Sequence, residues 1–384
     1  MIKLDKLVDS KLGNVVAVEP DGDGAAIFIR NDDQVELQKI PFKPYILLEH
    51  AELMDASNLD CELTTLHGPA PLKILAQFKN ITDYRAAMDH LKTLTGRSYS
   101  APGAPYKVVS DLTSQILSSE SIRCFRSMEF PQLRRLQFDL ETITAGEYDF
   151  PNANRAGDEI IIISMADSTG WETVLSQRDC SEKELLEKFV EVVQERNPDV
   201  LEGHNIFRFD LPYLETRAKR HKVKLKLGRD GSTFSKRNSR FSAAERAVNY
   251  TRYEVYGRNV IDTYILAVLY DVSHRSLESY GLKSIARHFG VAAPDRTYVE
   301  GSKITDCWHN DPDKLLAYAL DDVIETRSIS AILSPSYFYQ AQLVPMKYQD
   351  CVVRGNATRI DALFAAEYLV NRESLPWPGE TKRF

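Results

Sequence analysis

The chain has 384 residues, of which 43% are hydrophobic and 27% charged, a composition typical of a globular protein of about two domains. It contains no run of about 18 apolar residues and its first residues lack the apolar stretch of a secretory signal, so we expect neither a membrane span nor export. The five cysteines are scattered without metal-ligand spacing, which favours a reduced, cytoplasmic setting. The net charge of −7 argues mildly against nucleic acid as a partner, because phosphate contacts require a basic surface.

One stretch departs from this acidic average. Residues 217–240 contain ten Lys or Arg residues and one acidic residue, Asp230. A solvated surface accounts for most runs of charge, but a nucleic-acid backbone also binds to such a surface. Charge alone does not decide between the two interpretations.

Residues 1–130 have the pattern of a mixed, strand-rich domain. Short β-branched and apolar runs predict strands at 13–18, 25–30 and 45–48. Between the first two strands, Asp21-Gly22-Asp23-Gly24 predicts a hairpin turn. An amphipathic helix is expected at 81–94, with Asn80 or Thr82 as its N-cap.

From Pro131 onward the pattern alternates between strands and helices, which predicts a layered α/β domain over residues 131–335. Strands are expected at 133–140, 159–166, 200–203 and 222–227. Helices are expected at 181–195, 211–221, 262–270, 277–289 and 312–333. Residues 336–384 follow as a C-terminal extension of short segments.

Two carboxylates on one predicted strand are the first candidates for a functional site. Side chains alternate along a strand, so Leu136, Phe138 and Leu140 point into the core while Asp139 and Glu141 share the other face. Neighbouring carboxylates repel each other unless a cation neutralises them. The pair is therefore a candidate site for Mg²⁺ or Mn²⁺, although an Asp-x-Glu on a solvated strand face is common.

A second candidate lies where the strand at 200–203 gives way to a helix. Ligands of an open α/β sheet gather at the carboxyl ends of its strands, and Asp210 is placed there. The alternative is that Asn205 and Asp210 are only turn and cap residues. We interpret His204 as structural, because hard metal ions prefer oxygen ligands.

The third candidate pair is on the helix that Asp311 caps and Pro312 begins. Tyr318 and Asp322 are four residues apart and therefore lie on one face of this helix. Taken alone, such a pair is unremarkable.

Together the three sites form an ordered series: Asp-x-Glu on a strand, Asn-x₃-Phe-Asp after a strand, and Tyr-x₃-Asp on a late helix. This series resembles the three exonuclease motifs of family B DNA polymerases. Further segments are similar to archaeal-type members of that family: Pro41-Phe42-Lys43-Pro44-Tyr45, Leu227-Gly228-Arg229-Asp230-Gly231-Ser232, Tyr256-Gly257-Arg258-Asn259-Val260-Ile261-Asp262 and Arg354-Gly355-Asn356-Ala357. The similarity covers essentially the whole chain.

The resemblance implies an α/β (α+β) protein with an RNase-H-like 3′→5′ exonuclease domain and two divalent ions, Mg²⁺ or Mn²⁺. It assigns Asp139 as the bridge between the ions, with Glu141 and Asp322 completing the shell of the first and Asp210 holding the second. Tyr318 is expected to hydrogen-bond the attacking water or the scissile phosphate. The products would be 5′-mononucleotides released from a DNA 3′ end.

The resemblance also implies contacts to single-stranded DNA or a primer 3′ end. Asn205 and Phe209 are expected to hold the terminal nucleotide by hydrogen bonding and stacking. Thr142 is expected to be structural, closing the strand that bears the carboxylates, and it is also included among the candidate DNA contacts. From the basic stretch, Arg229, Lys236 and Arg237 are candidates to follow the backbone as part of a loop and hairpin.

Motifs of the polymerase palm and fingers are absent from these 384 residues, so we expect no polymerase activity from this chain alone. The alternatives are an exonuclease or assembly subunit of a split polymerase, a fragment of a longer polymerase, and a 3′→5′ exoribonuclease. The assembly reading predicts an exposed apolar patch formed by Leu363, Phe364, Tyr368, Leu369 and Trp377.

Overall fold

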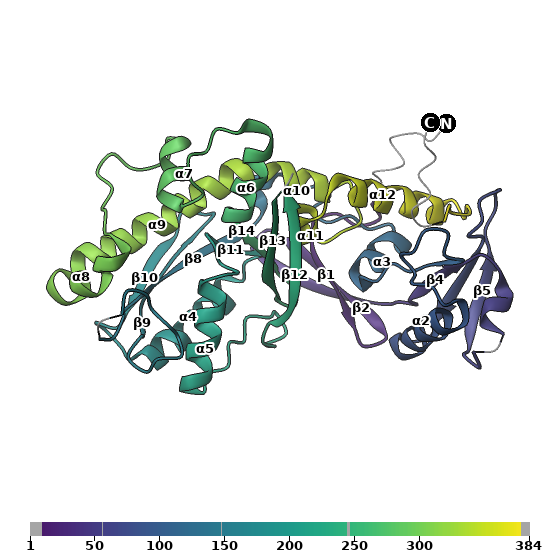
Figure 1. Ribbon diagram of the computed structural model, residues 1–384, viewed down its shortest axis with the longest axis horizontal. Coiled ribbons are helices and arrows are strands. Elements are labelled where there is room, and N and C mark those ends of the chain that lie inside the picture. The colour runs from purple at the N-terminus through teal and green to yellow at the C-terminus, as the bar shows by residue number, and fades with distance from the viewer. Residues whose placement is uncertain (1–9, 56, 147, 244–245, 378–384) are drawn as a thin grey trace. The chain divides into compact units, whose positions relative to one another are not determined.

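The computed structural model describes residues 10–55, 57–146, 148–243 and 246–377 (Figure 1). The chain divides into two compact units. One consists of residues 1–128 together with 339–384, and the other of residues 129–338. Among the described residues, no helix is both long and apolar enough to cross a membrane.

The first unit contains two antiparallel sheets. The first sheet has the order β1-β2-β3 and consists of β1 (Val15–Asp21), β2 (Gly24–Asn31) and β3 (Gln34–Pro41). The expected turn lies between β1 and β2, where Asp21 pairs with Gly24 and Gly22 has a φ of 57°. The second sheet has the order β5-β6-β4-β7 and consists of β4 (Tyr45–Leu48), β5 (Cys61–Thr65), β6 (Ile74–Phe78) and β7 (Tyr106–Lys107).

Helices pack on this second sheet. Helix α2 (Ile81–Thr95) begins at the predicted cap Asn80, whose side chain accepts the N–H of Asp83, and its buried residues join the core of the sheet. The other helical segments of this unit are η1 (Ala51–Met54), α3 (Leu112–Ser119), α11 (Tyr348–Val353) and α12 (Asn356–Val370). Helix α10 (Pro335–Ala341) contains the boundary at which the chain passes from the second unit to the first.

Helix α12 and the segment after it close the first unit. Leu72 and Leu375 form an isolated antiparallel bridge, and Ala365 belongs to the same buried cluster. Tyr368, Leu369 and Trp377 pack against that cluster, so the predicted exposed patch is wrong for these three residues. Phe364 is exposed as expected, at 44%.

The second unit is built on a five-stranded mixed sheet with the order β10-β9-β8-β11-β14. Its strands are β8 (Arg135–Thr142), β9 (Ile160–Asp167), β10 (Glu172–Ser176), β11 (Val200–Gly203) and β14 (Asn259–Asp262). Strand β8 pairs antiparallel with β9 and parallel with β11. Strands β12 (Ser235–Ala243) and β13 (Arg246–Glu254) form a separate hairpin.

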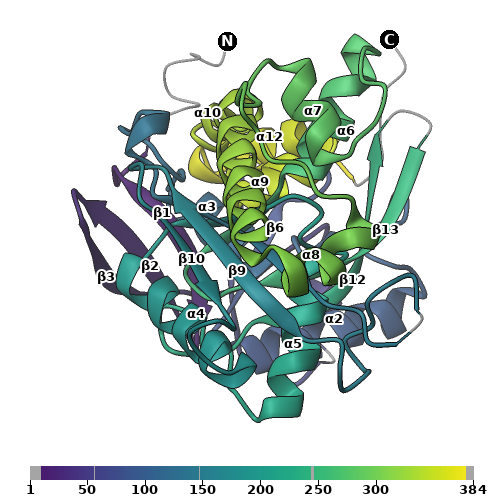
Figure 2. The same ribbon diagram turned by 90° about the vertical axis from the view of Figure 1, so that its left-hand side faces the viewer.

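Helices cover both faces of the five-stranded sheet. On one face, Phe138 of β8 meets Phe189 of α4 (Glu182–Arg196) with ring centroids 5.0 Å apart. On the other face, α9 (Pro312–Leu333) crosses the strands and contacts β8, β9 and β10 (Figure 2). The remaining helical segments of this unit are η2 (Phe130–Gln132), α5 (Asp210–His221), α6 (Thr263–His274), α7 (Leu282–His288), η3 (Gly301–Lys303) and α8 (Ile304–Asn310).

Most of the predicted elements of this unit are confirmed, but the strand expected at 222–227 is absent from the described structure. Leu225 and Leu227 are buried there, as the alternation indicated, yet the segment pairs with no strand. The Gln194 side chain of α4 hydrogen-bonds the carbonyl of Lys226, so helix α4 satisfies a group that a neighbouring strand would have bonded. The helix expected at 277–289 is also shorter and begins at Leu282.

Candidate active site

Strand β8 places Asp139 and Glu141 on the face that α9 covers. Phe138 faces α4 instead, as alternation along a strand requires. Asp139 is half-buried and Glu141 is 4% exposed. The strand therefore presents two carboxylates to the helix packed over it.

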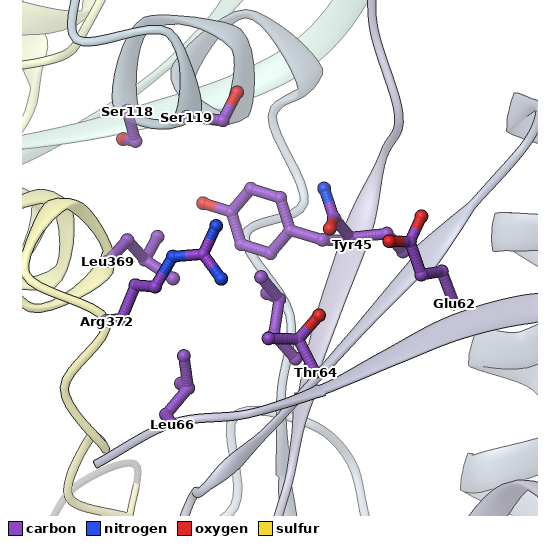
Figure 3. Close-up of a pocket in the computed structure, with 10 residues that line it drawn as sticks. Tyr45, Glu62, Thr64, Leu66, Ser118, Ser119, Leu369 and Arg372 are labelled. Atoms are coloured by element: carbon purple, nitrogen blue, oxygen red, sulfur yellow. The ribbon is translucent and has the colours of Figure 1, made fainter.

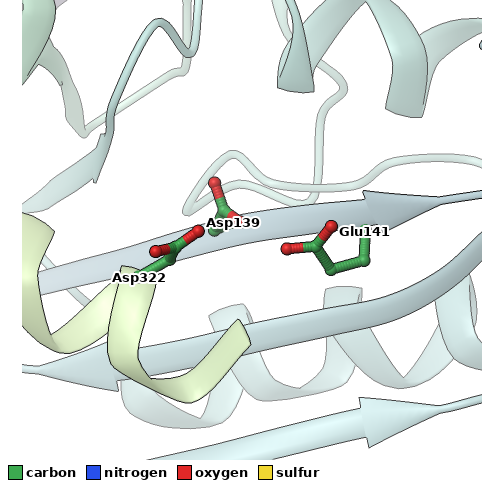
Figure 4. Close-up of side chains that lie close together, drawn as sticks. All are labelled: Asp139, Glu141 and Asp322. Carbon is green, nitrogen blue, oxygen red and sulfur yellow. The ribbon is translucent and has the colours of Figure 1, made fainter. Parts of the chain in front are cut away.

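Helix α9 brings the third carboxylate to the same point. Asp311 caps the helix by accepting the N–H of Lys314, and Pro312 follows at the first position, as predicted. Leu315 and Ala319 are fully buried against the sheet and fix the rotation of the helix. As a result, one carboxylate oxygen from each of Asp139, Glu141 and Asp322 lies within 4.8 Å of the others (Figure 4).

Asp210 approaches from the N-terminus of α5 and is 1% exposed. Its carboxylate accepts a hydrogen bond from the backbone N–H of Leu140, the residue between Asp139 and Glu141. Burial, followed by repulsion from Asp262, raises the pKa of Asp210 to about 8. Its Oδ1 atom is buried without a hydrogen-bond partner among the described residues.

The loop before Asp210 is held by a second buried carboxylate. Asp262, at the end of β14, accepts the backbone N–H of Asn205 at 2.8 Å and that of Phe207 at 3.4 Å. Asn205 has a φ of 66°, a left-handed conformation that Asn tolerates better than most residues. Asp262 therefore fixes the turn that delivers Asp210.

The carboxylates of this cluster repel one another, and a bound cation would neutralise that repulsion. Burial raises the pKa values of Asp139 and Glu141 well above the ordinary range, and the neighbouring carboxylates raise them further. Burial likewise raises the pKa of Asp322. Asp210 also interacts with Asp139 and Glu141, and four interacting carboxylates cannot all be ionised without compensation. Carboxylate oxygens are the ligands that hard divalent ions prefer. The unsatisfied oxygen of Asp210 fits the same interpretation, so these residues fit Mg²⁺ or Mn²⁺.

Tyr318 and Arg296 border the cluster on the α9 side. Burial, then the carboxylates of Asp322 and Glu141, raise the pKa of Tyr318, so its phenol stays protonated. The Arg296 guanidinium forms ion pairs with both Asp322 and Glu325. Sequence reasoning did not select Arg296, because a single arginine in the loop before α8 has no spacing that relates it to the motifs.

His204 has the structural role that was predicted. Its Nδ1 lies 2.9 Å from the Thr263 hydroxyl and its Nε2 lies 2.8 Å from the carbonyl oxygen of Tyr280. Burial lowers its pKa to about 4, so the ring is neutral. The imidazole therefore joins β11 to the segments around α6 and α7.

The residues expected to contact DNA occupy different environments. Phe209 is half-buried, with its ring centroid 5.4 Å from that of Tyr213, whereas Thr142 is 5% exposed. Lys236 and Arg237 lie on β12 and pair with Glu215 and Glu254. Both keep about half of their side-chain surface exposed, 47% and 49%, so they stay candidates.

Arg229 is placed differently from what a DNA contact requires. Its guanidinium is 5% exposed and pairs with the buried Asp199 at 2.6 Å. It also hydrogen-bonds the carbonyl of Pro198 at 3.1 Å. These contacts favour a structural role for Arg229, and Arg217 of the same basic stretch is likewise buried, paired with Glu182.

A separate pocket of about 210 Å³ lies within the first unit (Figure 3). Its lining residues include Tyr45, Glu62, Ser118 and Arg372, whose guanidinium points toward the Tyr45 ring. Glu62 is already paired with Lys43 at 2.7 Å. Among the residues that line this pocket, Glu62 is the one with a carboxylate.

Comparison with known proteins agrees with this geometry. Residues 106–285 match the family model described as DNA polymerase family B, exonuclease domain. This region is therefore similar to the exonuclease domain of family B DNA polymerases, and the chain is similar to DNA polymerases of archaea. It is 28% identical over 263 residues to a DNA polymerase of Archaeoglobus fulgidus, and 31% identical over 208 residues to DNA polymerase 2 of Aeropyrum pernix.

These relatives are much longer than the matched region. The alignments cover 68% and 53% of this chain but 30% and 23% of the two polymerases. The solved family B DNA polymerase of the hyperthermophilic archaeon Pyrobaculum calidifontis superposes with a TM-score of 0.74 at 18% identity. That match covers 94% of this chain and 50% of the polymerase, and it confirms the fold class, with an RNase-H-like exonuclease domain.

Proposed function

We propose that this chain is a metal-dependent 3′→5′ exodeoxyribonuclease that releases 5′-mononucleotides and does not polymerise DNA on its own. One observation carries the proposal: the carboxylates of Asp139, Glu141 and Asp322 converge within 4.8 Å, and the strand bearing two of them lies in the matched exonuclease region. In this proposal the exonuclease domain spans residues 131–335, with an N-terminal domain at 1–130 and a C-terminal extension at 336–384. The five unpaired cysteines are consistent with a cytoplasmic protein.

The four acidic side chains would hold the divalent ions, with Asp139 central because it interacts with the other three. Ions bound there supply an activated water and stabilise the leaving oxygen of the phosphodiester. Tyr318, which stays protonated, would donate a hydrogen bond to the water or to the scissile phosphate and so position it. Asn205 and Phe209, beside Asp210, would hold the terminal nucleotide.

The alternative of an assembly role has less support. Three of the five side chains expected to face a partner subunit are packed within the first unit. A ribonuclease with the same site remains the enzymatic alternative, since no residue of the cluster distinguishes a 2′-hydroxyl.

The test is degradation of a 3′-labelled single-stranded DNA with Mg²⁺ or Mn²⁺, beside an RNA of the same sequence and the Asp139→Ala variant. The proposal predicts metal-dependent release of labelled 5′-mononucleotide from the DNA, lost in the variant. Equal or faster loss from RNA would make the protein an exoribonuclease. No release from either substrate by the intact chain would contradict nuclease function.

A further inference from the structure

Lys283, on α7, lies beside Tyr318 and is used by none of the motifs. Its Nζ donates a hydrogen bond of 2.7 Å to the Tyr318 hydroxyl and one of 3.1 Å to the carbonyl of Val299. The same Nζ is 4.3 Å from the centroid of the Tyr318 ring. Lys283 is half-buried, and these two acceptors fix a side chain that would otherwise have many rotamers.

This contact determines which way the phenol can donate. A tyrosine hydroxyl has one proton and two lone pairs, and Lys283 occupies a lone pair because an ammonium group only donates. The phenolic proton is therefore free to point toward the carboxylate side, where Tyr318 interacts with Asp322. A group that must donate to a water or phosphate in the cluster is thereby held in the donating orientation.

Lys283 also adds positive charge beside the cluster. Burial and mutual repulsion raise the pKa values of Asp139 and Glu141, and Lys283 opposes that rise at both. At Asp322 it acts in the same direction, after Arg296. The ammonium group is thus close enough to three carboxylates to interact with each.

We propose that Lys283 is a positioning residue of the site, which orients the Tyr318 hydroxyl so that it donates toward the carboxylate cluster. This inference rests on the proposed exonuclease function. The simpler alternative is that Lys283 only fastens α7 to α9 through Tyr318 and Val299. The two interpretations predict different effects of the Lys283→Met substitution on turnover and on metal binding.

Turnover on single-stranded DNA is measured for Lys283→Met, Tyr318→Phe and the double variant, with Lys303→Met as control. Lys303 is an exposed lysine of the same unit and pairs with Asp306 at 3.2 Å. We expect Lys283→Met to lower kcat about 10- to 100-fold with little change in KM. In the Tyr318→Phe background the same substitution should lower kcat less than about threefold, because Lys283 acts through the Tyr318 hydroxyl, which this variant lacks. Lys303→Met should match the intact chain.

Mn²⁺ binding, measured by calorimetry without DNA, separates the two readings independently of activity. Loss of a cation beside the ion site should leave Mn²⁺ affinity unchanged or increased in Lys283→Met. Weaker Mn²⁺ binding would mean that the site has lost its shape, and would overturn the proposal. An unchanged kcat in Lys283→Met would also overturn the proposal. So would a double variant in which the two substitutions lower kcat by the product of their separate effects. If the intact chain binds Mn²⁺ but degrades no DNA, the proposed function fails and takes the role in turnover with it.

Discussion

Arg296 and Asp322 form a buried ion pair at the edge of the carboxylate cluster, and Arg296 also holds Glu325 one turn further along α9. The arginine is 6% exposed, and both acidic partners are buried. In the absence of a metal ion it is therefore the principal positive charge in contact with Asp322. Its removal leaves two buried acidic groups without their partner.

We predict that Arg296→Met lowers the free energy of unfolding of the metal-free protein by about 3 kcal/mol, because breaking a buried ion pair leaves uncompensated charge. Urea unfolding at pH 7 measures this. Arg178→Met is the matched control: Arg178 pairs with Asp313, and the two side chains are 44% and 82% exposed. The control should cost less than about 1 kcal/mol. Equal losses in the two variants would show that the Arg296 pair contributes no more than a surface pair.

From the raised pKa of Asp210 we predict an unusual dependence of the free energy of unfolding on pH. Its pKa is raised to about 8 in the folded protein, against about 4 in an unfolded chain. Between these values the folded state holds a proton that the unfolded state has lost, so stability falls as pH rises. The slope approaches about 1.4 kcal/mol per pH unit for one proton.

Unfolding in urea with a chelator, at several pH values from 5 to 8, tests this dependence. The slope should be reduced in Asp210→Asn, which has no proton to lose. Asp230→Asn, at an exposed loop position, should keep the slope of the intact chain. A slope that is the same in both variants would contradict the raised pKa.

Divalent ions should reverse this trend. Carboxylates bind metal only when deprotonated, so Mg²⁺ or Mn²⁺ should raise the midpoint of thermal unfolding more at pH 8 than at pH 5. An ion at about 100 times its Kd adds about 2.7 kcal/mol to the stability of the state that binds it. Asp139→Asn should respond much less, because Asp139 interacts with all three other carboxylates. An identical response in the variant would mean that the ions bind elsewhere.

The sequence was most informative where a local signal coincides with a structural boundary. The helix at 312–333 was predicted with its observed bounds, because Asp311 and Pro312 mark its start. The strand at 200–203 was likewise predicted at its observed length. The motif residues could be placed on elements because alternation and helical spacing state which side chains share a face.

The errors concern contacts between segments distant in the sequence. The alternation of polar and apolar residues at 222–227 correctly predicted that Leu225 and Leu227 are buried. Such periodicity does not show whether a partner strand is present. The exposed patch expected near the C-terminus was wrong for Tyr368, Leu369 and Trp377, because these side chains pack against the cluster that contains Leu47 and Leu72. Arg296 and Lys283 were missed for the same reason, since their partners on α9 are defined only by the fold.

Two adjacent residues of α9 provide the most direct test of the central claim. Asp322 belongs to the carboxylate cluster, whereas Asp321 accepts the backbone N–H of Thr297 at 2.8 Å and lies outside it. The rate of 3′-end degradation of single-stranded DNA in Mg²⁺ is measured for Asp322→Asn and Asp321→Asn. The account predicts a loss of about 100-fold or more for Asp322→Asn, since an ion ligand contributes several kcal/mol to the transition state, and a change of less than about threefold for Asp321→Asn. Full activity in Asp322→Asn would contradict the assignment of the site.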